Sequence, residues 1–342
     1  MQKTQSGPLM TMGIAAFNQS AYVQQAIASA LAQTYSPLEI ILSDDCSTDD
    51  TFEIIQAAVR QYRGPHRVIA NRTPGNQCIL GHVLNICDRA SGEMLVLAAG
   101  DDISHPQRVE KIAAQWQAHR PTAVFSNYEL VDEACRRIHA DYAPDKPSPL
   151  FEQVFNQRGQ NIHGASSAYD RNFMRSLPRP TGRFYFEDIF MTFMIYLHGG
   201  TIRKIDEPLV QYRQHDSSIT NASNARSQMF SAIKRRQLKS AEYEQNKQQL
   251  YAFFEEVLAQ TPDNGRANIA ALHAHAVQAG IRANWISMGT GERLATLLRD
   301  ASHETRSWLA PRVFGLNTFA AMRQLKAFAM DRVRNKSPHA TS

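Results

Sequence analysis

The chain of 342 residues is long enough for one large domain, or for a main domain with a smaller appendage. Its composition, 43% hydrophobic and 20% charged with 17 Gly and 15 Pro, is globular and excludes collagen-like, low-complexity and wholly disordered chains. The net charge is +5, but residues 306–342 carry seven Arg or Lys against one Asp, which leaves −1 for residues 1–305. Because most of the chain is nearly neutral, the sequence disfavours nucleic acid as a partner.

The four cysteines have neither the spacing of a zinc site nor the density of a disulfide scaffold, which favours a reducing compartment. Residues 1–13 lack the apolar core of a signal peptide. No stretch approaches the roughly 18 consecutive apolar residues that span a bilayer. We therefore expect a cytoplasmic protein, and leave open whether it rests on the inner face of the cell membrane.

Strand and helix patterns alternate through the first hundred residues. Short apolar runs predict strands at Leu9–Phe17, Leu38–Leu42, Arg67–Ala70 and Met94–Ala98. Apolar residues at helical spacing predict helices at Ala21–Gln33, about Phe52–Tyr62 and Ile79–Ala90. This alternation predicts an α/β fold in which helices flank a mostly parallel central sheet, with ligand sites at the carboxyl ends of its strands.

The second half of the chain continues the pattern and then changes. It predicts helices at Pro106–His119, Leu150–Arg158 and Glu187–His198, a loop at Ala143–Pro149, and strands at Thr122–Val131, Thr201–Ile205 and Pro208–Tyr212. From about Ala222 onward only helical patterns occur. We therefore predict a domain boundary near residue 220, with an α/β domain over residues 1–220 and an all-helical appendage over residues 221–342.

Two pairs of aspartates follow predicted strands, at the edge where a ligand site is expected. Asp44 and Asp45 follow a buried apolar run, where two repelling carboxylates need a compensating partner. One could accept a hydrogen bond from a nucleobase while the other binds ribose or braces the loop; alternatively, both cap the next helix. Asp101 and Asp102 follow Gly100, which permits close approach of the backbone to a ligand, and such a pair suits Mg²⁺ or Mn²⁺.

A third acidic pair, Glu187 and Asp188, begins a strongly apolar helix. Carboxylates at a helix N-terminus are stabilised by the helix dipole, which explains the pair without any function. The alternative is a general base, which needs a carboxylate in a cleft beside an acceptor hydroxyl. Spacing alone leaves both interpretations open.

Taken in order, these elements resemble glycosyltransferase family 2, enzymes of the GT-A fold that use nucleotide-diphospho-sugars. The resemblance covers roughly residues 8–220. It rests on the segments Ile14–Asn18, Ser29–Tyr35 and Leu38–Asp49, on Gly100-Asp101-Asp102 with His105-Pro106 behind it, on Glu187-Asp188, and on Tyr212–His215.

The resemblance implies roles for particular residues. Asp44 or Asp45 would contact the nucleobase, Asp101 would bind Mn²⁺ or Mg²⁺, and Asp188, beside Glu187, would be the catalytic base. The positions expected to line the donor site are Ala16, Phe17, Asn18, Asp44, Asp45, Gly75, Gly100, Asp101 and Asp102. The first Asp of the family's D-x-D motif falls on Ala99, so the metal has one carboxylate fewer, and Asp102 or His215 could compensate.

The resemblance also implies a reaction, in which one sugar is transferred with inversion from a nucleotide-diphosphate donor. UDP is the expected nucleotide, and the acceptor would be a glycan or lipid-linked hydroxyl in cell-surface polysaccharide synthesis. A sugar-phosphate nucleotidyltransferase is disfavoured, because Met12–Asn18 contains one glycine and no basic residue for a triphosphate. A non-catalytic nucleotide-sugar or glycan-binding module is the other alternative, supported by Ala99 and opposed by Asp188.

The basic tail, Arg306–Lys336, mixes aromatic and basic residues. As an amphipathic helix it could contact anionic lipid, and as an ordinary terminal helix it would pack on the protein. A homo-oligomer is also left open.

Overall fold

The computed structural model describes residues 7–142, 148–156, 162–215, 230–261, 268–299 and 303–324. The chain forms two compact units. Met1–His215 with Glu256–Ile269 is called the sheet unit here, and Asp216–Glu255 with Ala270–Ser342 the helical unit. The predicted boundary near residue 220 lies outside the described residues, so the two predicted domain ranges stay predictions.

The sheet unit begins with four parallel strands, which lie side by side in the order β3-β2-β1-β4. Their bounds are β1 Met10–Ala16, β2 Leu38–Asp44, β3 Arg67–Arg72 and β4 Met94–Ala99. The helices between them are α1 Val23–Leu31, α2 Thr51–Gln61 and α3 Cys78–Arg89. The predicted alternation of strands and helices is confirmed in this half, with every parallel connection made through a helix.

The sheet then continues as a mixed one, through β8 Ser167–Asp170, β6 Ala123–Val131, β9 Ile202–Arg213 and β5 Ile103–Ser104. β6 and β9 are parallel, whereas β8 and β5 run antiparallel to their neighbours, and β7 Arg137–Tyr142 pairs antiparallel with β6. The α/β class is confirmed, but the prediction of two short strands after Thr201 was wrong. The structure forms the single strand β9, because Asn127 Nδ2 donates to the Asp206 carbonyl (2.7 Å) and bridges the register shift there.

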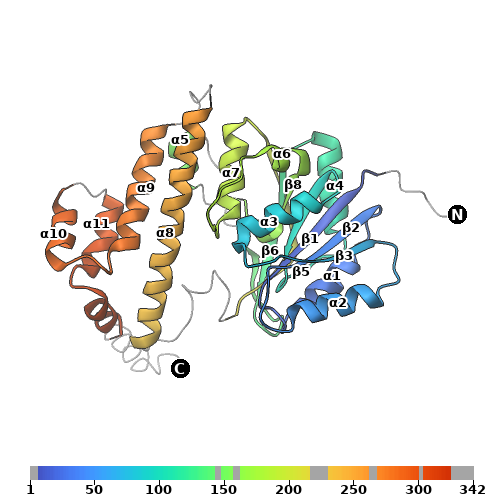
Figure 1. Ribbon diagram of the computed structural model, residues 1–342, viewed down its shortest axis with the longest axis horizontal. Helices are drawn as coiled ribbons and strands as arrows, with labels where there is room; N and C mark the ends of the chain where they lie inside the picture. Colours follow the sequence, from blue (N-terminus) through green and yellow to red (C-terminus); the bar gives the residue numbers. More distant parts are fainter. Residues whose placement is uncertain are drawn as a thin grey trace, which may run out of the picture. The chain divides into compact units, whose positions relative to one another are not determined.

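Helices cover both faces of the sheet. One face carries the main core, in which α1, α2 and α4 Arg108–His119 pack on alternate residues of β1, β2 and β4. The other face carries α3, α6 Arg171–Ser176 and α7 Glu187–Leu197, and Figure 1 shows α1 and α2 on the opposite side of the sheet from α3 and α7. Gly13 in β1 admits α3, since a Cβ there would lie 2.6 Å from Ile86 Cγ2. α5 Pro149–Phe155 packs on α7 through Phe155 and Phe193. Most of the loop predicted at Ala143–Pro149 lies outside the described residues.

The described residues after 229 include the helices α8 Phe230–Gln260, α9 Ile269–Asn284, α10 Thr290–Arg299 and α11 His303–Leu309, and residues 316–324 are also helical. The described part of the helical unit has its own small core around Trp285, with Leu309, Phe319 and partly buried Trp308. Arg312 lies over the Trp308 and Phe319 rings, at 4.1 and 4.4 Å from their centroids. The first part of the basic tail therefore packs on the protein. Residues 325–342, the rest of that tail, lie outside the described residues. Among the described helices, none has the length and apolar character needed to cross a bilayer.

Candidate functional site

The carboxyl ends of β1, β2, β3 and β4 meet at one edge of the sheet and are tied together by backbone hydrogen bonds. Asp45 N–H donates to the Ala16 carbonyl (2.8 Å), Gly100 N–H to Ala15 (3.0 Å) and Thr73 N–H to Asp44 (3.0 Å). The structure therefore brings together the strand-end residues that the sequence placed on separate segments.

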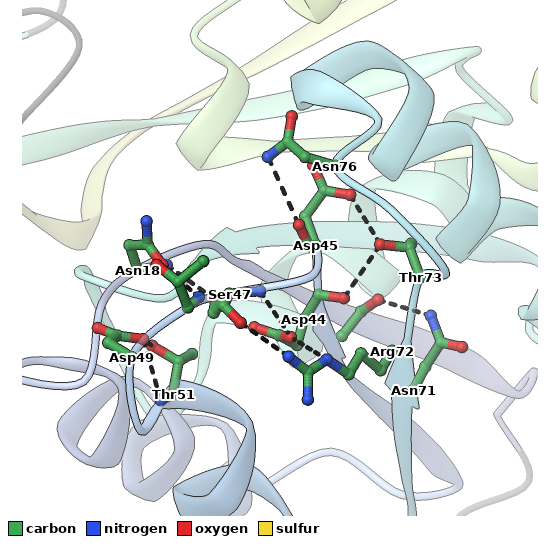
Figure 2. A network of polar contacts seen from close by, with 12 residues as sticks. Asn18, Asp44, Asp45, Ser47, Asp49, Thr51, Asn71, Arg72, Thr73 and Asn76 are labelled. Carbon is green, nitrogen blue, oxygen red and sulfur yellow. Dashed lines mark hydrogen bonds and ion pairs between the residues drawn. The ribbon is translucent and has the colours of Figure 1, made fainter.

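Asp44 is fully buried and is held by groups from the loop after β2 and from the end of β3 (Figure 2). Its Oδ2 accepts a hydrogen bond from Ser47 N–H (3.0 Å) and pairs with Arg72 Nε at 3.1 Å. The other carboxylate oxygen, Oδ1, is buried and has no hydrogen-bond partner among the described residues. An ionised carboxylate with one unsatisfied oxygen can accept a hydrogen bond from a ligand N–H or O–H.

Asp45, 2% exposed, braces the loop after β3 instead. Its Oδ1 accepts hydrogen bonds from Thr73 Oγ1 (2.9 Å) and from Gln77 N–H (2.9 Å), at the start of α3. Figure 2 shows Thr73 and Asn76 on either side of Asp45. Gly75 lies in the same loop, and a Cβ there would have no atom within 4 Å. The geometry thus gives Asp45 the bracing role, and it leaves open space at Gly75.

Hydrogen bonds hold the loop after β1 against the loop after β2 (Figure 2). Asn18 has a left-handed backbone (φ 52°), donates its N–H to Ser47 Oγ (2.8 Å) and accepts from Thr48 N–H (2.8 Å). Asp49 accepts from Ser20 N–H (3.0 Å) and Thr51 N–H (3.1 Å). Partial burial of Asp49 opposes ionisation, but hydrogen bonds from Thr51 and Ser20 outweigh it and lower its pKa.

Two other predicted donor-site residues, Ala16 and Phe17, directly precede Asn18. Ala16 is buried at the end of β1, whereas the Phe17 side chain is 43% exposed. An exposed aromatic ring at the sheet edge where the ligand is expected can stack on a planar group of that ligand.

Asp101 and His215 come together although 114 positions of chain separate them. Asp101 Oδ2 lies 3.0 Å from His215 Nε2, and the two side chains are 14% and 5% exposed. Gly100 permits this loop to lie against β1, because a Cβ there would lie 2.8 Å from Ala16 Cβ and 3.2 Å from Ala16 Cα.

Asp102 lies deeper than Asp101, at 3% exposure, and its Oδ1 accepts a hydrogen bond from Arg213 N–H (2.9 Å). Burial and the neighbouring Asp101 carboxylate raise the pKa of Asp102 well above its usual value. The fully buried Arg108 partly offsets this shift. The two aspartates are therefore not equivalent: Asp101 is the accessible carboxylate and Asp102 braces the loop onto β9.

The Asp101–His215 pair fits a divalent cation. In an octahedral Mg²⁺ or Mn²⁺ site with ligand distances of about 2.1 Å, neighbouring ligand atoms lie about 3.0 Å apart. Asp101 Oδ2 and His215 Nε2 are within hydrogen-bond distance of each other at 3.0 Å, and the same separation would let them take two adjacent ligand positions. Among the described residues no group of three or more His, Cys, Asp or Glu side chains could hold a metal. The remaining ligands would have to be water or a ligand's phosphate oxygens, as is usual for Mg²⁺.

Glu187 and Asp188 begin α7, and contacts link this helix start to the end of β4. The Glu187 carboxyl is buried against Gly164, where a Cβ would lie 2.2 Å from Glu187 Oε1. The carbonyl of Ala165, next along the chain, accepts a hydrogen bond from Arg108 Nη2 (3.1 Å), which also donates to Leu97 in β4 (2.6 Å). Burial, with the Asp188 carboxylate beside it, raises the pKa of Glu187 well above its usual value. Asp188 is less buried and accepts from Ile189 N–H (2.8 Å), so it is the more accessible carboxylate of the pair.

His163 lies just before this Gly164 segment, between two tyrosines. Its ring stacks on Tyr128 at 4.1 Å and meets Tyr212 edge-on at 4.8 Å. Burial and the nearby Arg108 guanidinium lower the pKa of His163 to about 4. The imidazole is therefore neutral at physiological pH.

Sequence reasoning missed the arginines that hold this site together, Arg72, Arg108 and Arg213. A signal existed for Arg108, which shares the apolar helix face of Ile112 and Trp116, where a charged residue needs buried partners. Arg72 and Arg213 end strands, and no periodicity indicates what they contact.

Comparisons with known proteins bear on the family and the fold of this chain. Residues 11–177 match the family model described as glycosyl transferase family 2. The match confirms, for residues 11–177, the resemblance to family 2 glycosyltransferases seen in the sequence.

Two curated relatives illustrate the similarity. EpsE of Bacillus subtilis, named as a glycosyltransferase, is 31% identical over 144 residues, which cover 42% of this chain and 51% of EpsE. The glycosyltransferase GlyG of Streptococcus pneumoniae is 24% identical over 225 residues, or 62% of this chain and 72% of GlyG. The match thus spans about half the length of EpsE.

Among solved structures, the mannosyltransferase PcManGT from Pyrobaculum calidifontis, in complex with GDP-Man and Mn²⁺, superposes with a TM-score of 0.51. The alignment covers 94% of this chain and 88% of PcManGT at 14% identity. At this identity the likeness concerns the fold alone, and it supports the expected GT-A architecture.

Proposed function

We propose that this protein is an inverting glycosyltransferase that moves one sugar from a nucleotide-diphosphate donor to a hydroxyl of a glycan or lipid-linked acceptor. The proposal places this reaction in cell-surface polysaccharide synthesis. The observation that carries it is the Asp101–His215 pair, at the same sheet edge as the buried Asp44 carboxylate with its unsatisfied Oδ1. The family 2 domain and the names of the relatives support it.

In this proposal the donor lies across the ends of β1, β2 and β4. Asp44 Oδ1 accepts a hydrogen bond from the N–H of the base, and uridine is the base expected. Phe17 lines the same edge, and Asp45 and Asn18 hold the two loops that form it. Asp101 and His215 would hold Mn²⁺ or Mg²⁺, which would neutralise charge on the departing nucleoside diphosphate. The cation in the PcManGT complex is a property of that protein and is consistent with this assignment.

Asp188 is the general base of the proposed reaction. It removes the proton from the acceptor hydroxyl as that oxygen forms its bond to the anomeric carbon, while the bond from that carbon to the diphosphate oxygen breaks. One displacement on the face opposite the leaving group inverts the configuration. Burial and the neighbouring Asp188 carboxylate raise the pKa of Glu187, and Asp188 is the less buried member of the pair, so the proposal assigns the base to Asp188.

The first measurement is a thermal-shift panel of UDP, GDP, TDP and CDP, each with Mn²⁺, with Mg²⁺ and with EDTA. A ligand at 100 times its Kd adds about 2.7 kcal/mol, which shifts the Tm of a domain of this size by several degrees. We expect one nucleotide to stabilise the protein, with metal only. No response in any condition would overturn the proposal.

Asp188→Asn then separates catalysis from binding. We expect release of nucleoside diphosphate from UDP-glucose, UDP-N-acetylglucosamine or GDP-mannose to fall about 10²- to 10⁴-fold, because the base is lost. The metal-dependent Tm shift should be retained. Asp206→Asn, at a side chain 90% exposed, is the matched control. Equal rates for parent and Asp188→Asn would favour a non-catalytic binding module instead.

A further inference from the structure

The proposed function gives no role to Tyr22. Its ring nevertheless contacts Arg213, the last residue of β9, and His215, which lies two residues further along the chain. The Tyr22 and His215 rings stack with centroids 4.6 Å apart and planes 30° apart. Arg213 Cζ lies 4.7 Å from the centroid of the same Tyr22 ring. Tyr22 is thus the shared packing partner of His215 and Arg213.

The position of Tyr22 is rigid, because the backbone around it is fixed. It lies at the start of α1, where its N–H donates to Gln19 (2.9 Å) and its carbonyl accepts from Gln25 N–H (2.9 Å). Gln19 N–H in turn donates to Thr51 Oγ1 (2.8 Å). The hydrogen bonds between the loops after β1 and β2 therefore also hold the backbone that carries the Tyr22 ring.

Arg213 is fixed as firmly on the other side. It is 2% exposed, its N–H donates to Asp102 Oδ1 (2.9 Å), and its guanidinium contacts Cys135 Sγ at 3.0 Å. Two residues further along, His215 is 5% exposed, with Nε2 3.0 Å from Asp101 Oδ2. The stack on Tyr22 fixes the rotation of the imidazole, and that rotation decides whether Nε2 faces Asp101.

We propose that Tyr22 and Arg213 form a clamp that orients His215, so that Nε2 and Asp101 Oδ2 together bind one divalent cation. Tyr22 is a positioning residue, acting on the cation through His215. Ala99 offers no carboxylate to the cation. His215 therefore supplies a larger share of the protein's metal ligands than it would beside a D-x-D motif with two carboxylates. The inference rests on the proposed function, because it concerns the cation of that same site.

The test measures Mn²⁺ binding directly, from the electron paramagnetic resonance signal of free Mn²⁺ during titration of the protein with UDP or with GDP. Removing an outer-shell partner of a metal ligand commonly weakens metal affinity about 10- to 100-fold, and we expect that loss for Tyr22→Leu. Tyr22→Phe keeps the ring and is the matched control, with affinity expected within about threefold of the parent. The Tm of each variant in EDTA shows whether it remains folded.

A double variant separates the clamp from a general packing effect. In His215→Ala the ligand is gone, so adding Tyr22→Leu should weaken Mn²⁺ binding no further. A parent that binds Mn²⁺ while Tyr22→Leu binds it equally well would overturn the clamp and leave the proposed function standing. A further loss in the double variant would also overturn it. A parent that binds no Mn²⁺ with either nucleotide would overturn both the clamp and the metal-dependent reaction.

Discussion

At the residue scale, the buried polar groups of the site differ in how they are compensated. Asp44 is paired with Arg72, Asp45 accepts only neutral hydrogen bonds, and Asp102 and Glu187 have raised pKa values. A buried carboxyl that takes up a proton avoids most of the cost of burying a charge. In the proposed reaction the two less buried carboxylates, Asp101 and Asp188, bind the cation and act as the base.

His163 predicts a pH dependence of stability. Its pKa is about 4 in the folded protein and about 6.5 in an unfolded chain, so between these values the unfolded state binds more protons. Lowering the pH from 6.5 to 4 should therefore reduce the free energy of unfolding, by up to about 1.4 kcal/mol per pH unit from this residue. Below pH 4 the contribution of His163 is fully lost.

The measurement compares chemical denaturation of the parent and His163→Gln across that range. Glu187 and Asp102, with raised pKa values, act in the opposite direction, so only the difference between the two proteins isolates His163. We expect a shallower pH slope for His163→Gln, and the exposed His119→Gln should match the parent. Parallel curves for parent and His163→Gln would contradict the prediction.

At the element scale, short helices depend on their ends. α6 has only six residues, and Asp170 Oδ1 caps it by accepting Phe173 N–H (2.9 Å). Such a helix is not stable from propensity alone, so its cap and packing hold it. The same segment carries the chain from β8 toward the Glu187–Asp188 helix start.

Asp170→Ala should lower the free energy of unfolding by about 0.5–2 kcal/mol, because the N-cap acceptor is lost. Asp170→Asn retains an oxygen acceptor and should cost clearly less. Urea denaturation of the two variants tests this. Equal losses in both would show that the carboxylate's charge, rather than the capping hydrogen bond, stabilises this helix.

At the scale of the whole molecule, the two units have separate cores. Trp116 of α4 packs in the sheet unit's core, whereas Trp285 packs in the helical unit's core against Trp308 and Phe319. Separate cores predict that damage to one unit leaves the other folded.

Trp285→Ala should cost about 3–5 kcal/mol, as large core truncations do, and should increase hydrogen exchange in the helical unit. Protection of the sheet unit by UDP or GDP with Mn²⁺ should survive. Trp116→Ala is the matched truncation and should give the opposite pattern. Loss of protection throughout the chain after either substitution would show that the units unfold together.

The sequence alone predicted the first half of the sheet well. Each of its four parallel strands contains a run of apolar residues, and helices with amphipathic periodicity lie between them, so local pattern and tertiary structure agree there. The sequence also located Asn18, Asp44 and Asp101 at strand ends, because polar residues directly after buried runs are readable without a structure.

The antiparallel strands β5, β7 and β8 were not predicted. β5 and β8 have only two and four residues, too few to show a period. β9 was divided in two because Pro208 suggests a break, which pairing with β6 overrides. These strands are stabilised by pairing with neighbouring strands. Pairing between residues far apart in the chain leaves no local signal in the sequence.

What the sequence by itself determined is the class of fold, the family and the acidic residues that stand at strand ends. Only the tertiary structure distinguishes the two members of each pair, because Asp44 and Asp45, or Asp101 and Asp102, are the same residue type in the sequence. Hydrogen bonds from Gln77 to Asp45 and from Arg213 to Asp102 make these two carboxylates braces. The pairing of Asp101 with His215 spans 114 positions of chain, and the packing of β9 and Tyr22 creates it.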